Sequence, residues 1–342
     1  MIGVFAVREG VLSPLPSPDP AALPTDALWV DLLNPSVEEE AAVEHLLGVG
    51  VPTRQEMAEI EESARLYEER GALVMTAVVV TGISERRPTT AEVTFVLTPR
   101  ALVTIRYADP LPFRTFAAKC QRDPEAHDSS DLVFLSLIEN IVNRLADVIE
   151  ATNEQLDTLS DEIFAENGSF PGGDVPAATP GWKHGLQRRP PSADLQAVVK
   201  RLGRASSLVG KLRESLLSMG RMLAYFRQGA GDRLRDGARA RLQTLDRDVA
   251  SLTEYDAQLS VQIGFLLEAT FGLISLEQNN IIKVFSIAAV LFLPPTLVGT
   301  VYGMNFEHIP ELSWAFGYPF ALLLMVASAV APYYWFKSRG WL

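Results

Sequence analysis

Cysteine is almost absent from this 342-residue chain, since Cys120 is the only one. A single thiol excludes a disulfide within the chain and a site built from several thiolates, and it suits a reducing compartment. The four histidines lack the short spacing of a histidine-based zinc site. No phosphate-binding loop of the G-x-x-x-x-G-K-[ST] pattern occurs and no nucleophile–base pair stands out. We therefore expect no ATP-driven step, no enzyme activity and no organic cofactor.

Positive charge is also scarce, because 30 lysines and arginines stand against 42 aspartates and glutamates. The resulting formal net charge of −12 argues against nucleic acid as a partner and is compatible with binding cations. The first residues lack a basic segment followed by an apolar core, so we expect no signal peptide. The bulk of the chain is then expected in the cytosol.

The first 128 residues mix strand-like and helical segments and are expected to form a cytosolic α/β domain. Runs rich in Val, Ile and Thr indicate strands at residues 4–9, 27–33, 72–83, 91–99 and 101–108. Two capping boxes, each a Ser or Thr followed three residues later by Glu, predict helices over 36–47 and 53–70. This order predicts an α+β fold, a mixed sheet covered by helices.

Long helices are expected to follow. Apolar residues recur at helical spacing over 130–165 and 194–227, and these segments are expected to pair as an antiparallel hairpin within residues 129–230. Gly and Pro interrupt them in a loop at about 166–192. A stalk helix is then expected over 231–280.

The stalk helix carries a seam of alternating three- and four-residue spacing, typical of a coiled coil or bundle. The seam consists of Leu242, Leu245, Val249, Leu252, Asp256, Leu259, Ile263 and Leu266. The carboxylate of Asp256 is out of place there. In a symmetric ring of helices it would join a carboxylate cluster around an axis. The interpretation that we favour is that the register drifts and that Asp256 faces water.

Two apolar segments close the chain. Residues 281–303 carry one charge, Lys283, and residues 318–336 end in the aromatic cluster Tyr333, Tyr334, Trp335 and Phe336. About 20 helical residues at about 1.5 Å each match a hydrocarbon core of about 30 Å. We therefore expect two transmembrane helices in a lipid bilayer.

The flanking charges predict the orientation of this hairpin. Lys283 precedes the first span, and Lys337 and Arg339 lie in the short tail 337–342, so the positive-inside rule places both termini in the cytosol. The loop 304–317 then faces outward, where Glu307 and Glu311 would concentrate cations. Two spans are too few to enclose a pore, so a channel requires several copies around an axis.

The most distinctive motif is Tyr302-Gly303-Met304-Asn305, directly after the first span. With "EQNNIIKVFSIAAVLFLPPTLVGTVYGMNFEHIPELSWAFGYP" and "TRQEMAEIEESARLYEE", it resembles the CorA magnesium transporter family in its proteobacterial form. The resemblance implies a funnel-shaped homopentamer in the inner membrane, whose first transmembrane helix continues the stalk and lines the pore. It implies Mg²⁺ influx down the electrochemical gradient, Co²⁺ and Ni²⁺ as further cargo, and closure when cytosolic Mg²⁺ binds between subunits.

The resemblance also implies a role for each motif residue. Gly303, Met304 and Asn305 form the selectivity filter, with carbonyl oxygens of Asn305 and Gly303 accepting hydrogen bonds from the waters of hydrated Mg²⁺. Met304 packs, because a thioether is too soft for magnesium. Gly303 also permits a positive φ and close packing at the mouth of the pore. Without the resemblance, Asn305 would be interpreted as the cap of the preceding helix.

Counting back from Asn305 as in the family gives the expected pore-lining positions Asn279, Ile282, Phe285 or Ser286, Leu293 and Thr296. Asn279 and Thr296 offer oxygens to a hydrated ion, whereas Ile282 and Leu293 would form apolar constrictions that gate by dewetting. The family often has methionine at these two apolar positions. Spacing alone does not choose between Phe285 and Ser286.

Regulation and the identity of the ion remain open at this stage. The stalk carboxylates that we consider for a regulatory Mg²⁺ site are Asp246, Asp248, Asp256 and Glu268. Bound ions would offset carboxylate repulsion and hold a closed ring. One rival interpretation is a Zn²⁺ transporter of the same superfamily, and another is a non-conducting, membrane-anchored oligomeric metal sensor or scaffold. The intact Gly-Met-Asn triplet counts against the first, and polar residues at pore spacing count against the second.

Overall fold

The structure is a computed structural model that describes residues 1–8, 10–15, 23–59, 61–85, 87–120, 128–164, 192–231, 234–305, 314 and 316–339. The chain divides into two compact units. The first comprises Met1–Lys183 and Ala197–Leu267, and the second comprises His184–Gln196 and Glu268–Leu342.

The first unit contains a seven-stranded mixed sheet of order β2-β1-β3-β7-β6-β5-β4. Its strands are β1 (Ile2–Arg8), β2 (Val11–Pro14), β3 (Ala27–Leu33), β4 (Leu66–Glu69), β5 (Ala72–Thr81), β6 (Thr89–Leu97) and β7 (Leu102–Arg106). The β3–β7 pair is parallel, and the other neighbouring pairs are antiparallel. The expected α+β fold with a mixed sheet is thereby confirmed, and β2 and β4 are additions to the predicted strands.

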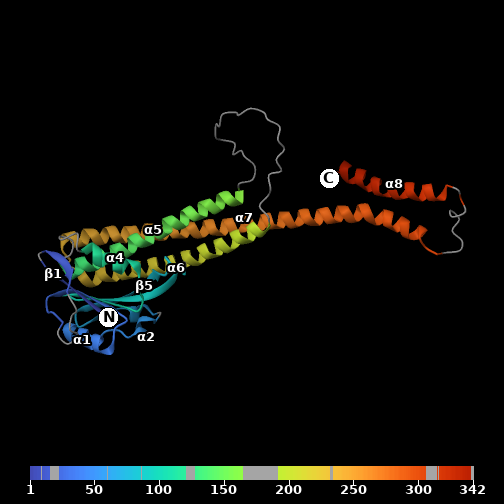
Figure 1. Cartoon of the computed structure of the whole chain (residues 1–342). Helices are drawn as coiled ribbons and strands as arrows, with labels where there is room; N and C mark the ends of the chain where they lie inside the picture. Colours follow the sequence, from blue (N-terminus) through green and yellow to red (C-terminus); the bar gives the residue numbers. More distant parts are fainter. Residues whose placement is uncertain are drawn as a thin grey trace. The chain divides into compact units, whose positions relative to one another are not determined.

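Helices cover both faces of this sheet. The helices of the described residues are α1 (Val37–Leu47), α2 (Arg54–Met57), α3 (Glu62–Arg65), α4 (Leu111–Cys120), α5 (Ser130–Phe164), α6 (Ser192–Ala230), α7 (Asp236–Tyr302) and α8 (Gly317–Ser338), the last of which belongs to the second unit and does not take part in this covering. Figure 1 shows α1 and α2 on one side of the sheet, and α5, α6 and the first part of α7 on the other.

Both predicted capping boxes are present. Ser36 accepts a hydrogen bond from the Glu39 backbone N–H while Glu39 accepts one from the Ser36 N–H, and Thr53 and Glu56 repeat the pattern. Each box satisfies backbone donors that the first turn of a helix leaves unpaired. The predicted helix boundaries at these two N-termini are therefore correct.

The predicted single helix over 53–70 is wrong. The chain leaves α2 after Met57, forms the short α3, and then enters β4, which pairs antiparallel with β5. Arg70 and Gly71 both have positive φ, 50° and 84°, which is the backbone of a two-residue hairpin turn. Pairing with the buried strand β5 therefore outweighs the helical preference of this glutamate-rich segment.

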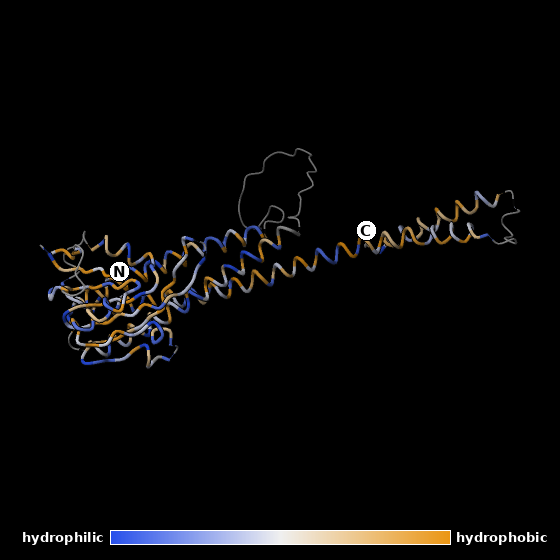
Figure 2. The backbone as a smooth tube through the Cα atoms, turned by 60° about the horizontal axis from the view of Figure 1, so that its bottom comes forward, coloured by the Kyte–Doolittle hydropathy of each residue, from blue (hydrophilic) through white to orange (hydrophobic). Residues whose placement is uncertain are grey.

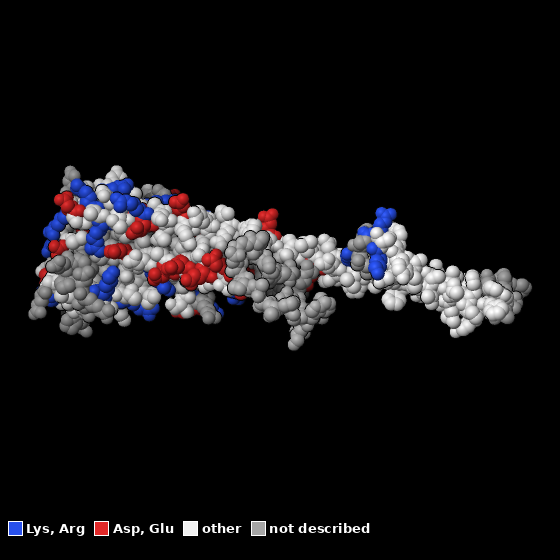
Figure 3. Space-filling view, turned by 90° about the horizontal axis from the view of Figure 1, so that it is seen from above, with Lys and Arg blue, Asp and Glu red and all other residues white. Residues whose placement is uncertain are grey.

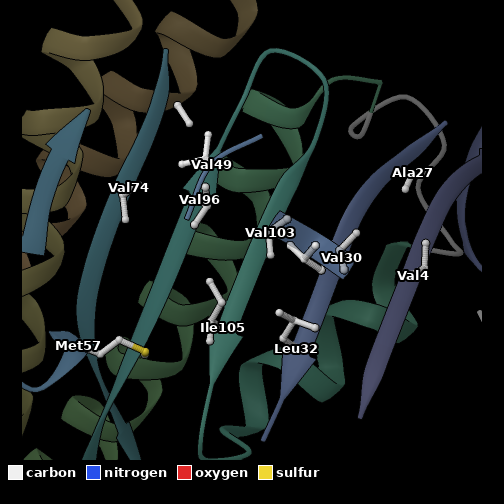
Figure 4. Packing of buried hydrophobic residues seen from close by; sticks show 12 residues of the cluster. Val4, Ala27, Val30, Leu32, Val49, Met57, Val74, Val96, Val103 and Ile105 are labelled. Carbon is white, nitrogen blue, oxygen red and sulfur yellow. The ribbon is translucent and has the colours of Figure 1, made fainter. Parts of the chain in front are cut away.

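One face of the sheet is aliphatic and packs against α1 and α2. Val30, Leu32, Val103 and Ile105 from the central strands meet Met57 of α2 in one cluster (Figure 4). Because side chains alternate along a strand, the neighbours of these residues point to the opposite face.

The opposite face is aromatic. Trp29 of β3 stacks on Phe5 with ring centroids 4.3 Å apart, and its Nε1 donates a hydrogen bond to Thr104 Oγ1 over 3.0 Å. Phe134 of α5 lies 5.6 Å from Phe95 of β6 and 4.8 Å from Phe226 of α6, centroid to centroid. These rings join the long helices to the sheet.

Along part of its outer edge, β5 forms hydrogen bonds with a helix instead of with a strand. β4 pairs only with Ala72–Met75, and further along β5 the α6 serines take its place. Ser215 Oγ donates to the Val78 carbonyl over 2.7 Å, and Ser218 Oγ accepts from the Val78 N–H over 2.9 Å. Two hydroxyls therefore satisfy the backbone of an otherwise open strand edge.

Ser215→Ala is expected to lower the free energy of unfolding by about 1–3 kcal/mol, because the buried Val78 carbonyl loses its hydrogen-bond donor. Ser206→Ala, at an exposed position of the same helix, is the matched control and should change the stability little. Chemical denaturation of the solubilised protein measures the difference. Equal stability of the two variants would show that the edge contact contributes nothing.

Ion pairs define how the long helices run. Arg201 of α6 pairs with Glu162 of α5 near one end, whereas Arg241 of α7 pairs with Glu139 of α5 near the other. α6 is therefore antiparallel to α5, and α7 is parallel to it. The seam predicted on α7 is its buried face: except for the half-buried Leu252, every seam residue has an exposed fraction of 4% or less.

Among the residues that the structure describes, two helices are long and apolar enough to cross a membrane, and the second unit contains their apolar segments, the last part of α7 and α8. Figure 2 shows hydrophobic residues along both, and on the face seen in Figure 3 they are uncharged apart from the basic residues near the end of α8. α8 extends the predicted span 318–336 by one residue at its start and two at its end.

Candidate functional site

The candidate site begins with the continuity of α7, which runs unbroken from Asp236 to Tyr302. Pro294 and Pro295 lie inside this helix. Proline has no backbone N–H that could donate a hydrogen bond to the carbonyl four residues earlier. The carbonyls of Val290 and Leu291 therefore receive no hydrogen bond from Pro294 and Pro295. Helices in a membrane tolerate such prolines where neighbouring groups satisfy the released carbonyls.

The expected pore positions share one face of α7, and this face is uncovered. At about 100° per residue they fall within one third of the helix circumference. In the single chain their side chains are all exposed: Asn279, Ile282, Phe285, Ser286, Leu293 and Thr296. Ile282, Phe285 and Leu293 are 61%, 72% and 68% exposed, unusual values for such apolar side chains unless lipid or further copies cover them.

The opposite face of α7 is the half-buried one. Its members are Ile287, Ala288, Leu291, Pro294, Pro295, Val298, Gly299 and Tyr302. α8 packs on this side, since a Cβ placed on Gly299 would lie 3.2 Å from Met325 Cε of α8. The second apolar helix therefore leaves the candidate pore face open.

Thr296 has its hydroxyl hydrogen committed to the helix, because Oγ1 donates to the Phe292 carbonyl over 2.7 Å. Thr300 does the same one turn later, donating to the Thr296 carbonyl over 2.8 Å. The lone pairs of Thr296 Oγ1 remain acceptors. Water bound to a cation presents only hydrogens outward, so an acceptor at this position suits a hydrated ion.

The Gly-Met-Asn triplet follows the last turn of α7. The Gly303 N–H donates to the carbonyls of Gly299 and Thr300 over 3.0 and 3.2 Å, and the Met304 N–H donates to the Val301 carbonyl over 3.3 Å. Gly303 does not have a positive φ, so it does not use the conformational freedom that a glycine permits. The glycine continues the helical hydrogen bonds of α7 in place of turning the chain.

Asn305 lies three residues beyond the end of α7 and is exposed. Its φ is not positive, and its amide has no hydrogen-bond partner among the described residues. The interpretation of Asn305 as a C-terminal helix cap therefore finds no support. Glu307 and Glu311 of the expected outer loop lie outside the described residues.

Asp256 contradicts the interpretation that we favoured, because it does not face water. It is fully buried between α7 and α6, and its Oδ2 accepts a hydrogen bond from Arg213 Nε over 3.0 Å. Its Oδ1 has no partner within the described part of the chain. The register does not drift: Asp256 stays on the seam, which faces α6 of the same chain and not an axis of a ring.

Burial raises the pKa of the Asp256 carboxyl, and the Arg213 guanidinium opposes this rise without cancelling it. A carboxyl with a higher pKa in the folded than in the unfolded state destabilises the fold where it is ionised. This penalty is complete above the raised pKa and disappears as the pH falls towards the ordinary range of aspartate.

Asp256→Asn is therefore expected to raise the unfolding temperature at neutral pH, because the amide keeps an acceptor for Arg213 without the buried charge. The advantage over the wild type should shrink on acidification through the raised pKa. Thermal unfolding across this pH range measures it, with the exposed Asp248→Asn as control. An advantage that grows on acidification would contradict the assignment.

The other regulatory candidates differ in their environment. Asp246 Oδ2 pairs with Arg227 Nη1 over 2.8 Å, whereas Asp248 and Glu268 are exposed. Within the described residues, no three His, Cys, Asp or Glu side chains of one chain gather as a metal site. The structure therefore does not bring these carboxylates together within a single copy.

Sequence reasoning missed the face of α7 that α8 covers. The sequence feature that could have indicated this face is its pair of small residues, Ala288 and Gly299, since small residues allow helices in membranes to approach each other closely. It also missed Arg213, whose role depends on a contact 43 positions along the chain.

Comparisons with known proteins identify the family of the chain. The chain matches the family described as "CorA-like Mg2+ transporter protein" over residues 25–172 and 188–338. It is 32% identical over its full length to the magnesium transport protein CorA of Sodalis glossinidius and 31% identical to that of Escherichia coli K12, with 100% of each chain covered.

Among solved structures, the complete CorA magnesium transporter of Methanocaldococcus jannaschii matches with a TM-score of 0.74 at 16% identity, covering 100% of this chain and 99% of that one. The full-length CmaX protein matches with a TM-score of 0.64 at 16% identity, covering 99% and 97%. At such identities these structures show the fold. The family match and the identity to its curated members establish that the chain belongs to the CorA-like Mg²⁺ transporter protein family.

Proposed function

We propose that several copies of this chain surround a membrane pore for Mg²⁺, lined by the exposed face of α7 and entered at Gly303-Met304-Asn305. One observation carries the proposal: α8 packs on the half-buried side of α7, so the polar and apolar positions at pore spacing are left uncovered. A second copy placed against that open face would cover its exposed apolar side chains. The resemblance to the family favours five copies.

The proposed filter recognises the ion with its water shell. Mg²⁺ is small and gives up water reluctantly, so a site that strips it needs strong compensation. A ring of Asn305 side-chain carbonyls, supported by the Gly303 backbone carbonyls, accepts hydrogen bonds from the coordinated waters instead. Neutral acceptors attract the ion without trapping it. Because such a ring distinguishes hydrated ions by their size and charge, Co²⁺ and Ni²⁺ are proposed as further ions that the pore transports.

The proposed gate is apolar, and the driving force is electrical. Rings of Leu293 and Ile282 exclude water from a narrow pore and so oppose passage of a hydrated ion. Once the pore is hydrated, a divalent cation moving through an inside-negative potential of 100 mV gains about 4.6 kcal/mol, twice the value for a single charge. No other energy source is required.

Orientation and regulation complete the proposal. Lys337 in the last turn of α8 and Arg339 directly after it favour a cytosolic carboxyl end, with the last part of α7 and α8 spanning the inner membrane. Closure by cytosolic Mg²⁺ requires carboxylates from neighbouring copies. Asp248 and Glu268 are the candidates that remain exposed, whereas Asp246 and Asp256 already bind arginines.

Uptake of Mg²⁺ into liposomes holding the purified full-length chain tests the proposal. We expect the uptake of Mg²⁺ to increase with an inside-negative potential. Co²⁺ and Ni²⁺ should inhibit this uptake more strongly than Zn²⁺ does. Uptake no faster than in protein-free vesicles would refute transport. Faster accumulation of Zn²⁺ than of Mg²⁺ would favour the zinc transporter instead.

A further inference from the structure

The second half of α5 is acidic, and the first half of α6, which runs beside it, is basic. Between Leu145 and Phe164, α5 has six aspartates and glutamates and no lysine or arginine. Between Leu195 and Arg213, α6 has five lysines and arginines and no aspartate or glutamate. Among the described side chains, a single ion pair, Arg201 with Glu162, joins these two segments. The two helices therefore keep most of their opposite charges apart within one chain.

Five of the acids form an acidic stripe on the outer face of α5. At about 100° per residue they fall within about a quarter of the helix circumference. All are exposed, and none forms an ion pair with another described residue: Asp147, Glu150, Glu154, Asp157 and Asp161. The second half of α5 lies above α6 and α7 in Figure 1, and a run of acidic side chains is visible from that side in Figure 3. Like charges one turn apart on a helix repel each other, so a positively charged partner would stabilise this stripe.

A basic stripe lies on α6 and consists of Lys200, Arg204 and Lys211. These positions share one face of the helix at about 100° per residue. Lys200 and Arg204 are exposed, and Lys211 donates a hydrogen bond from Nζ to Ser207 Oγ over 3.0 Å. Within the described part of the chain none of the three forms an ion pair, not even Lys211 with Glu214 one turn further on. Their positive charge can therefore pair with a partner.

The two stripes lie at the same height along the paired helices. The ion pair between Arg201 Nη1 and Glu162 Oε2, 2.6 Å long, fixes the heights of α6 and α5 relative to each other. Because the helices are antiparallel and have the same rise per residue, each step forward along α6 corresponds to a step back along α5. Arg204 is then level with the turn between Asp157 and Asp161. The lysine two turns later on α6 is level with the acids two turns earlier on α5.

A ring of copies would bring these stripes together. α7 runs beside both helices and leads into the proposed pore, so the axis of such a ring follows the helices. Rotation about that axis changes no height, and each copy meets its two neighbours with two different surfaces. The acidic stripe of one copy and the basic stripe of the next then match in sign and in height. Two copies of the same stripe would instead bring like charges together.

We propose that the acidic stripe of α5 binds the basic stripe of α6 in a neighbouring copy of this chain. The inference rests on the proposed function, because it needs the several copies that surround the pore. Exposed ion pairs contribute little stability one by one and are weakened by salt. The contact therefore acts mainly on specificity: it aligns neighbouring copies in height and selects the head-to-tail arrangement.

Disulfide cross-linking of the full-length protein in liposomes tests the contact. Glu154→Cys and Ser207→Cys, combined in one chain, place thiols on the acidic stripe and beside the basic one at nearly the same height, and Cys120 is buried. A mild oxidant should link copies into covalent dimers and larger species on a denaturing gel. The matched control combines Glu154→Cys with Gln228→Cys, an exposed position of α6 about 30 Å further along the helix, and should remain unlinked.

Charge exchange separates attraction between the stripes from mere proximity. In the chain with Glu154→Cys and Ser207→Cys, Arg204→Asp should slow the formation of linked species roughly two- to fivefold at low salt, because it replaces an attraction by a repulsion. Asp161→Arg should slow it similarly from the other stripe. The two exchanges together should restore the rate, which misfolding would not do.

The mass of the solubilised protein without oxidant, measured by light scattering, separates this inference from the proposed function. A monomer would refute both the pore and the contact. If the protein is an oligomer, three results would overturn the contact alone: no links between the stripes, equal linking in the control pair, or no recovery in the chain with both charge exchanges.

Discussion

Asn305→Ala is expected to reduce Mg²⁺ uptake into liposomes at least about tenfold at low external Mg²⁺. The amide is exposed, and within the described residues it makes no hydrogen bond, so its loss removes no contact of the fold. In the proposed ring each copy contributes one acceptor to the polarised waters of the ion. A single hydrogen bond to a charged group contributes about 1.5–3 kcal/mol, and 1.4 kcal/mol corresponds to a factor of ten.

Asn143→Ala is the matched control, because Asn143 is an exposed asparagine of α5 outside both apolar helices. It should transport Mg²⁺ like the wild type when the amount of protein in the vesicles is equal. Competition by Co²⁺, Ni²⁺ and Zn²⁺ should lose its order in Asn305→Ala. If both variants take up Mg²⁺ at the wild-type rate, Asn305 does not select the ion.

Leu293→Asn is expected to hold the pore open. In vesicles preloaded with Mg²⁺, where the wild type should be closed, the uptake of isotopically labelled Mg²⁺ should rise by about tenfold. An apolar ring at this position keeps water out, whereas a ring of amides hydrates the constriction, and a barrier lowered by only about 1.4 kcal/mol already corresponds to that factor. Leu293 is 68% exposed in the single chain, so the substitution disturbs no contact within it.

Leu291→Asn makes the same chemical change on the half-buried face of α7, towards α8. Protein-normalised uptake by this control should stay low in preloaded vesicles. Equally raised uptake by both variants would mean that the effect of an asparagine does not depend on which face of α7 carries it. Unchanged uptake in Leu293→Asn would show that Leu293 does not form the gate.

Local signals predicted much of the fold. The strand at 27–33 was found with its correct ends, because Val30 and Leu32 alternate with residues that point to the aromatic face. Both capping boxes predicted their helix N-termini, since a cap depends only on residues three positions apart. Long apolar periodicity was enough for α5, α6 and the first part of α7, and continuous apolar runs of membrane-spanning length were enough for the rest of α7 and for α8.

The errors lie where distant parts of the chain decide the outcome. β4 was taken for a helix because its strand state depends on pairing with β5 across the Arg70-Gly71 turn. Asp256 was expected in water because its partner, Arg213, comes from another helix. For the candidate site, spacing predicted which residues share a face of α7, but not that α8 covers the opposite one.

Cysteine substitution along α7 tests the central claim most directly. The native cysteine should react little with thiol reagents, because Cys120 is buried and its burial raises the pKa of the thiol to about 12. Little of the thiol is then ionised at neutral pH. Cysteines at Asn279, Ser286 and Thr296 probe the exposed face, and cysteines at Ala288 and Val298 probe the half-buried face. A positively charged thiol reagent should block Mg²⁺ uptake only in the first set. Block in the second set alone, or equal block in both, would contradict a pore lined by the exposed face of α7.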